Sequence, residues 1–435
     1  MNPLLQFAKR LASKGLKATI ATTHYTVRSI DAPNVNVEPI SDGFDEGGFK
    51  QAPDLDTYLE NFIAAGSKSL SELIQKLKRS SNPVSCIVYD SMLPWALYVA
   101  KEHGIYGAAF FTTSAAVSTI YYQVHEGLLS FSSTTEGPHI LSVPGFPKMG
   151  YGDMASFLAV PVSYPAYLAS VMDQFSNLEM ADWVLGNTFE DLESQVAKEM
   201  TMPRPMMMIG PMIPSAYLDG RINGDTGYGA NLWKPVRDKC LKWLGTKPPN
   251  SVIYVSFGSM AELTATQTEE LAMGLKGSCK HFLWVLKESE HCMLPNRFID
   301  STEETMLLVT WCDQLEVLAH QATGCFVTHC GWNSTLEGLS LGVPMVAVPQ
   351  WTDQPTNAKF MEEVWRVGVR AKMGEKGIVG REEFQLSIRE VMEGERSEEF
   401  KKNASKWREL AKEAIGEAGS SDKNIDKFVG YLSSD

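Results

Sequence analysis

The segment Trp311–Gln354 constrains this chain most, because its apolar and polar residues fall into blocks that match a strand, a turn, a helix and a second strand. We predict an apolar strand at Cys325–Thr328, a polar turn at His329–Ser334 and a helix at Thr335–Leu341. A strand followed by a helix and another strand forms a parallel pair, and parallel sheets carry helices on both faces. The chain is therefore expected to belong to the α/β class.

The same alternation fills both halves of the chain. Strands are predicted at Lys17–Thr22, Val84–Tyr89, Gly107–Thr112, Ser251–Phe257, Phe282–Leu286 and Met306–Thr310, and helices from Asn2, within Leu55–Leu77, at Trp95–His103 and at Gln267–Lys276. Residues 201–250 are rich in Pro, Gly and Met, which is typical of a linker. A chain of 435 residues is too long for one core, so we predict two domains. Their expected bounds are 1–214 for the N-terminal domain, 215–250 for the linker, 251–415 for the C-terminal domain and 416–435 for a final helix.

The predicted turn at His329–Ser334 presents several hydrogen-bond donors to one point. Backbone N–H groups, a Ser hydroxyl and a His lie at the start of a helix, where the helix dipole favours an anion. Trp311 offers a flat face on which a base can stack, and Glu337 offers a carboxylate to a ribose diol. Asp353 and Gln354 follow the second strand and are placed to bind sugar hydroxyls. The segment thus provides for a base, a ribose, a pyrophosphate and a sugar.

This segment resembles the signature box of the plant UDP-sugar-dependent glycosyltransferases of small molecules, and the resemblance extends over nearly all of the chain. It includes IVYDSMLPWALYVAKEHG, IGPMIPSAYLD, SVIYVSFGSM, FLWV, NAKFMEEVWRVGVR and EGERSEEFKKNASKWRELA. The most similar branch glucosylates salicylate, other small carboxylates and thiohydroximates. The resemblance implies two Rossmann-like doubly wound domains that face each other across a cleft (GT-B type). It also implies that the final helix packs back on the N-terminal domain.

The resemblance further implies a donor site in which uracil stacks on Trp311 beside Gln314. The candidate donor-binding residues are Ser259, Trp311, Cys312, Gln314, His329, Gly331, Trp332, Asn333, Ser334, Glu337, Asp353, Gln354 and Thr112. Some of them have a structural alternative: Thr112 as an ordinary strand-end residue, Trp311 as a core residue and His329 as a core or surface histidine. Trp332 is expected to be a packing residue whose backbone contacts the sugar. The phosphates are expected to meet backbone N–H groups, a His and a helix dipole, with no metal ion.

The family's catalytic base is a His in a G-H-x-N-P loop directly after the first strand. This chain begins Met1-Asn2-Pro3, which matches only the end of that motif. We therefore expect that the start site of the sequence was chosen too late, and that the first strand, the Gly and the catalytic base of the motif are missing. Asp90 matches the Asp that orients the base, and the alternative for it is a turn or capping role. Loss of the strand should leave its neighbours without ladder partners. Position 313 is Asp, where relatives mostly carry Pro or Ser.

Composition excludes several other classes of protein. A net charge of −13 argues against a nucleic-acid partner, because no basic patch is large enough to balance it. The seven Cys are scattered without CxxC or metal-ligand spacing, which predicts reduced thiols in the cytosol. The sequence contains no apolar run of about eighteen residues, so no membrane span is predicted. The N-terminus lacks the apolar core of a signal peptide. We therefore expect a cytoplasmic monomer that is not inserted in a membrane.

These features predict an enzyme that transfers glucose from UDP-glucose to a hydroxyl or carboxyl of a small aromatic metabolite, with inversion and without a cofactor. The acceptor pocket is expected to come from variable loops such as Asp153–Tyr167, which the sequence does not resolve to one substrate. A catalytically silent UDP-sugar-binding protein is the first alternative, because the base is missing. A nicotinamide dehydrogenase is the second, and the lack of G-x-G-x-x-G after a strand argues against it.

Overall fold

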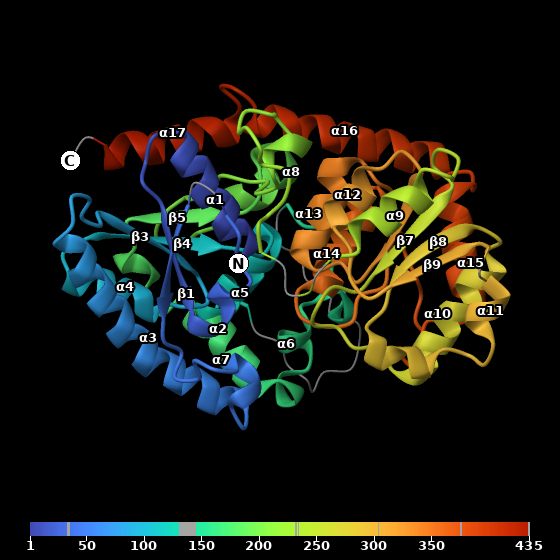
Figure 1. The fold of residues 1–435 in the computed structure, drawn as a ribbon, viewed down its shortest axis with the longest axis horizontal. Coiled ribbons are helices and arrows are strands. Elements are labelled where there is room, and N and C mark those ends of the chain that lie inside the picture. The colour runs from blue at the N-terminus through green and yellow to red at the C-terminus, as the bar shows by residue number, and fades with distance from the viewer. Residues whose placement is uncertain are drawn as a thin grey trace. The chain divides into compact units, whose positions relative to one another are not determined.

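Figure 1 shows the computed structural model, which describes residues 1–32, 35–129, 145–230, 233, 235–302, 304–374 and 376–433. The chain divides into two compact units. Unit 1 comprises Met1–Thr135, Val160–Leu232 and Glu413–Asp435, and unit 2 comprises Glu136–Ala159 and Trp233–Lys412.

Unit 2 contains one parallel sheet, whose described strands lie in the order β12-β11-β10-β7-β8-β9. The strands are β7 (Val252–Ser256), β8 (His281–Val285), β9 (Met306–Val309), β10 (Thr323–Thr328), β11 (Met345–Ala347) and β12 (Gly368–Arg370). The order runs outward in both directions from the adjacent strands β7 and β10, which makes them the switch point where doubly wound sheets bind ligands. Both strands are buried along their whole length, as expected under helices on both faces.

Helices lie on both faces of this sheet (Figure 1). They are α9 (Arg237–Leu244), α10 (Ala265–Gly277), α11 (Phe298–Thr302), α12 (Gln314–Ala319), α13 (Trp332–Leu341), α14 (Gln354–Glu363), α15 (Arg381–Met392) and most of α16 (Ser397–Ile415), with the short α6 (Ser156–Ala159). Leu271 and Leu275 of α10 and Phe384 of α15 share one buried cluster with Ile253 and Phe282 of the sheet. The core of unit 2 therefore sits between the sheet and these helices.

The parallel strands of unit 1 form two separate sheets in the described part. One pairs β1 (Thr19–Thr23) with β2 (Asn36–Ile40), and the other has the order β3-β4-β5-β6. The strands of the second sheet are β3 (Cys86–Asp90), β4 (Tyr106–Phe111), β5 (Trp183–Gly186) and β6 (Met206–Met208). Among the described strands, β1 pairs only with β2 and β3 only with β4, so each has an unpaired edge. The first three residues of β3 are only partly buried, in contrast to the buried β7.

The helices of unit 1 are α1 (Asn2–Ser13), α2 (His24–Val27), α3 (Leu55–Lys78), α4 (Trp95–Glu102), α5 (Ala115–His125), α7 (Pro165–Asp173), α8 (Glu190–Lys198) and α17 (Ser420–Leu432). Helix α1 contacts both sheets. Leu5 belongs to a small buried cluster that Ile20 of β1 packs against, and the Phe7 ring lies 5.8 Å from that of Phe110 on β4.

The polar residues of α1 are held by the segment that follows β6. Asp225 accepts hydrogen bonds from Gln6 Nε2 at 2.5 Å and from Lys9 Nζ at 2.9 Å. Arg10 Nη1 donates to Asp219 at 3.0 Å, and the side chains of this pair are almost completely buried. Residues 215–227, at the start of the predicted linker, thus dock on α1.

Helix α17 at the end of the described chain packs on the four-stranded sheet. Ser421 Oγ donates to the carbonyl of Gly210 at 2.6 Å, and Asn424 Nδ2 donates to that of Met208 at 2.9 Å. The Phe428 ring meets the Trp183 ring edge-on at 5.1 Å. These contacts tie the last helix to unit 1.

Two sequence predictions about local structure are wrong. The composition of residues 201–250 is typical of a linker, but Met206–Met208 within them form β6, because these apolar residues complete the sheet beside β5. Helix α13 begins at Trp332 and not at Thr335, because Gly331 is extended and serves as the N-cap. No helix in the described ranges is long and apolar enough to cross a membrane.

Candidate functional site

The candidate site lies in unit 2, at the carboxyl ends of β7 and β10. After β10 the chain makes a tight turn in which Cys330 takes the left-handed φ of 65°, which is uncommon for a residue with a side chain. The backbone N–H of Cys330 donates to Thr328 Oγ1 at 3.2 Å, and Asn357 Nδ2 donates to the Cys330 carbonyl at 3.0 Å. This turn leads directly into α13, and the dipole of the helix favours an anion near its N-terminus. The backbone N–H of Trp332, the first residue of the helix, is directed at the Asp353 carboxylate.

His329 is enclosed between two glycines in this turn. A Cβ on Gly258 would lie 2.9 Å from His329 Cε1, and a Cβ on Gly331 would lie 2.7 Å from Nε2. Gly258 also has the left-handed φ of 71°, so both its conformation and its surroundings require glycine. Burial lowers the pKa of His329 to about 4, and its Nδ1 has no hydrogen-bond partner. The imidazole is therefore neutral at physiological pH.

Four side chains form a partly buried hydrogen-bonded chain. Tyr254 Oη on β7 donates to Gln314 Oε1 at 3.1 Å. Gln314 Nε2 donates to Ser334 Oγ at 3.1 Å and to Glu337 Oε2 at 2.7 Å. Burial raises the pKa of Tyr254 well above its usual range, so the phenol keeps its proton and can donate it to Gln314. The amide of Gln314 is thereby fixed, and its NH2 group faces the carboxylate of Glu337.

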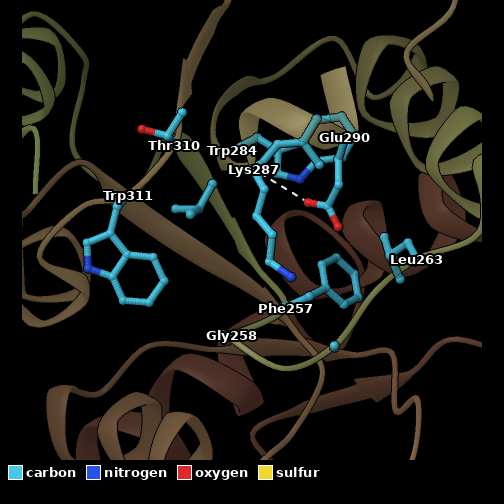
Figure 2. A pocket seen from close by; sticks show the side chains of 11 residues that line it. Phe257, Gly258, Leu263, Trp284, Lys287, Glu290, Thr310 and Trp311 are labelled. Carbon is cyan, nitrogen blue, oxygen red and sulfur yellow. Dashed lines mark hydrogen bonds between the residues drawn. The ribbon is translucent and has the colours of Figure 1, made fainter. Parts of the chain in front are cut away.

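A pocket opens next to these residues, beyond the ends of β7, β8 and β9. Figure 2 shows Trp311 on one side of this pocket and Lys287 and Glu290 on the other. The indole of Trp311 packs against that of Trp233, with ring centroids 4.8 Å apart and the ring planes tilted by 50°. The backbone carbonyl of Trp311 accepts from the Val236 N–H at 3.1 Å. An aromatic face at the end of a parallel sheet can stack on a planar ring.

Asp353 and Gln354 lie at the start of α14, and both side chains are tied down. Asp353 Oδ2 accepts from Asn357 Nδ2 at 2.7 Å, and Oδ1 accepts from Thr352 Oγ1 at 2.6 Å. Gln354 Oε1 accepts from the N–H groups of Gln350 and Trp351 at 2.8 and 3.1 Å. These bonds fix the two side chains in one orientation, which suits recognition of hydroxyl groups.

The sequence model of one protein family, described as UDP-glucoronosyl and UDP-glucosyl transferase, matches residues 154–414. The chain belongs to this transferase family. Its two α/β units are the Rossmann-like units of the GT-B type.

Individual family members are similar over almost the whole chain. UDP-glycosyltransferase 74F2 of Arabidopsis thaliana is 48% identical, covering 100% of this chain and 96% of the relative. Flavonol 7-O-beta-glucosyltransferase of the same plant is 44% identical, covering 99% and 95%. The crystal structure of Os79 from O. sativa in complex with UDP has a TM-score of 0.91 and 40% identity, covering 99% of this chain and 97% of that one.

The transferase structure brings most predicted donor residues together within unit 2. Gln314, Ser334 and Glu337 contact one another, and the His329 ring lies against Gly258, next to Ser259. Asn333 is exposed in the first turn of α13. The Trp332 side chain is buried against Trp365, 5.9 Å away, which agrees with the packing expected for it.

Two positions beside Trp311 have clear structural contacts. The Cys312 thiol is buried 3.5 Å from Tyr254 Oη, which points it into the protein. Asp313 caps α12, and its carboxylate accepts from the Glu316 N–H at 3.4 Å. This contact gives a physical reason for an acidic residue there.

Asp90 and Thr112 lie in unit 1, at the carboxyl ends of the adjacent strands β3 and β4. Asp90 Oδ1 accepts from the Met92 N–H at 3.1 Å, and burial raises the pKa of this carboxyl. Among the described residues, no histidine hydrogen-bonds to Asp90.

Sequence reasoning missed two residues that support the site. Tyr254 lies in the apolar run VIYVS, where a phenol with a polar tip is the available signal. Asn357 follows Asp353 by one helical turn, the spacing at which side chains on a helix meet.

Proposed function

We propose that this transferase moves glucose from UDP-glucose to a hydroxyl or carboxyl of a small aromatic plant metabolite, with inversion at the anomeric carbon. The observation that carries the proposal is the fixed Gln314–Glu337 pair on α12 and α13, together with Trp311 in the wall of the pocket. A carboxylate can accept hydrogen bonds from the ribose of a nucleotide, and an indole can stack on its base. The similarity to Arabidopsis glucosyltransferases supports glucose as the sugar.

Each part of the donor has a proposed partner. Trp311 stacks on uracil beside the backbone of Cys312, Glu337 accepts from the ribose hydroxyls, and the turn around His329 with Ser259, Asn333 and Ser334 binds the phosphates. The Trp332 backbone, Asp353, Gln354 and Thr112 are the proposed sugar contacts. We propose no metal ion for this step, because the groups at the phosphates are N–H donors and a neutral imidazole, which stabilise leaving-group charge directly.

The proposed chemistry on the acceptor side requires a base oriented by Asp90. The described residues place no histidine on that carboxylate, and the edge of β3 next to it is unpaired. We therefore propose that the chain as given transfers sugar slowly to hydroxyl acceptors, which must lose a proton during attack. Carboxylic acids are already ionised near pH 7 and depend less on a base.

The alternative function is a catalytically silent UDP-sugar-binding protein. It is supported by the same Gln314–Glu337 pair and by the lack, among the described residues, of a histidine hydrogen-bonded to Asp90. Calorimetric titration with UDP and turnover of UDP-glucose with salicylate-like acids separate the two functions. Binding with turnover supports the enzyme, binding without turnover supports the silent protein, and absence of binding contradicts both.

Donor and acceptor preferences can be tested in the same assay. Gln354 is associated in the family with glucose, so UDP-glucose should react faster than UDP-galactose, and equal rates would contradict this assignment. A small aromatic or aliphatic acid should react better than a large glycosylated terpenoid. We further propose that the protein acts as a monomer in the cytosol, where its seven unpaired cysteines stay reduced.

A further inference from the structure

Thr352, directly before Asp353, adopts an unfavourable backbone conformation. Its φ is 58°, in the left-handed region that β-branched residues rarely enter. Such a conformation persists only where neighbouring groups hold it, and it is concentrated at ligand sites. The Thr352 hydroxyl donates to Asp353 Oδ1 at 2.6 Å, while Asn357 holds Oδ2, so the conformation of Thr352 restrains one of the two oxygens of that carboxylate.

Ser156 of α6 holds Thr352 through both of its backbone polar groups. The Ser156 N–H donates to the Thr352 carbonyl at 2.8 Å, and the Thr352 N–H donates to Ser156 Oγ at 2.7 Å. The next residue, Phe157, meets the Trp351 ring edge-on at 5.9 Å. Ser156 and Thr352 are far apart in sequence but belong to the same unit.

The segment that carries Ser156 is also held by hydrogen bonds from α14 and β12 of the same unit. Thr356 Oγ1 donates to the Asp153 carbonyl at 2.8 Å, and Arg370 Nη1 donates to Asp153 Oδ1 at 2.7 Å. Arg370 Nη2 also donates to the Gly152 carbonyl at 3.0 Å. Loss of the Ser156 hydroxyl therefore leaves the segment docked and removes only the restraint on the Thr352 N–H.

We propose that Ser156 is a positioning residue for sugar recognition, because it fixes the backbone of Thr352 and through it the Asp353 carboxylate. The inference rests on the proposed function of Asp353 as a sugar contact. It assigns part of the donor specificity to residues 153–157, a segment that the sequence predicts to shape the acceptor pocket. Uracil, ribose and phosphates are bound by other elements, so only affinity for the sugar depends on Ser156.

The test compares UDP-glucose with UDP, which lacks the sugar, by isothermal titration of the whole chain without acceptor. Ser156→Ala should weaken UDP-glucose binding by about five- to tenfold, the usual effect of one lost hydrogen bond, and should change UDP binding by less than about twofold. Ser156→Thr keeps the hydroxyl and should restore the wild-type ratio. Thr356→Val removes a buried hydroxyl of the same neighbourhood without touching Thr352 and serves as the matched control, with no change in the ratio.

Each outcome has one meaning. If Ser156→Ala changes both affinities equally, or changes neither, the positioning role is wrong while the donor site stands. A changed ratio in Thr356→Val would also overturn the role, because any disturbance of the segment would then suffice. Wild-type protein that binds neither ligand would contradict the proposed function itself. Thermal melting of each variant checks that it is folded.

Discussion

The Gln314 amide donates a 2.7 Å hydrogen bond to one oxygen of Glu337, and Tyr254 fixes that amide from the opposite side. The three residues come from a strand and two helices that are distant in sequence but meet at the end of β7. Because Oε2 is occupied by Gln314, the carboxylate has a defined orientation before any ligand arrives. Such preorganisation reduces the cost of ordering on binding.

Replacing Glu337 should weaken the nucleotide site directly. We expect Glu337→Ala to reduce UDP affinity by about 1–3 kcal/mol, because the ribose hydroxyls lose a charged acceptor. Isothermal titration measures the change, with 2′,3′-dideoxy-UDP as the control ligand that should bind both proteins alike. Unchanged UDP affinity would show that Glu337 does not contact the ribose.

His329 makes a specific prediction about acid stability. Its pKa in the folded protein is about 4, whereas an unfolded histidine has a pKa of about 6.5. The unfolded chain therefore takes up a proton first, so the contribution of His329 to the free energy of unfolding is complete above pH 6.5 and is lost as the pH falls toward 4. At pH 5 the loss amounts to about 2 kcal/mol.

Urea unfolding at pH 7 and pH 5 measures this loss. The wild type should lose about 2 kcal/mol more between the two pH values than His329→Asn, which carries no titrating group there. Other groups titrate equally in both proteins and cancel in the comparison. Equal losses would mean that the His329 imidazole is protonated as easily in the folded state as in the unfolded state.

The docking of α1 on residues 215–227 should be important for stability. Asp225 is buried and is the acidic partner of Lys9, so Asp225→Ala leaves a buried ammonium without its counter-ion. Removing one partner of a buried pair costs about 3–5 kcal/mol. Asp426→Ala breaks the exposed pair with Lys14 and should cost less than about 1 kcal/mol. Denaturation followed by fluorescence compares the two, and similar losses would refute the importance of burial.

Periodicity predicted much of the fold because the decisive elements are strongly apolar. The predicted strands at Ser251–Phe257 and Met306–Thr310 correspond to β7 and β9. The helices predicted between successive strands indicated that the strands of the sheet pair in parallel, as β8 and β9 do. The linker-like composition gave a wrong prediction at Met206–Met208, because a strand of only three residues at the edge of a sheet is too short to show a periodic pattern. The docking of α1 on Asp219 and Asp225 depends on contacts more than two hundred residues apart, which no local pattern contains.

For the site, the sequence indicated which residues gather but not how they are held. The box placed Gln314 and Glu337 near one another, as the structure has them. Tyr254 and Ser156 lie outside the signature box. Their hydroxyls form hydrogen bonds with residues of the box, and these contacts become visible only in the folded structure, where β7 and α6 lie next to it. Contacts of this kind depend on tertiary packing and not on motif spacing.

The final prediction concerns the base that should accompany Asp90. Two proteins are compared, the chain as given and the same chain preceded by an apolar strand and Gly-His, so that the junction reads G-H-Met1-Asn2-Pro3. A third carries Ala in place of the added His and separates the effect of the strand from that of the base. A general base contributes about 10²–10⁴ in rate, and pairing the open edge of β3 should improve geometry as well. We expect the chain as given to glucosylate a phenol at no more than about a hundredth of the rate of the His-containing extension, with a smaller difference on a carboxylate, which is ionised already.

The Ala version should recover stability but not the phenol rate. If the first two proteins glucosylate the phenol equally fast, another residue serves as the base and the role proposed for Asp90 is wrong. UDP affinity should be the same in all three, because Trp311, Gln314 and Glu337 lie in unit 2 and are untouched by the extension.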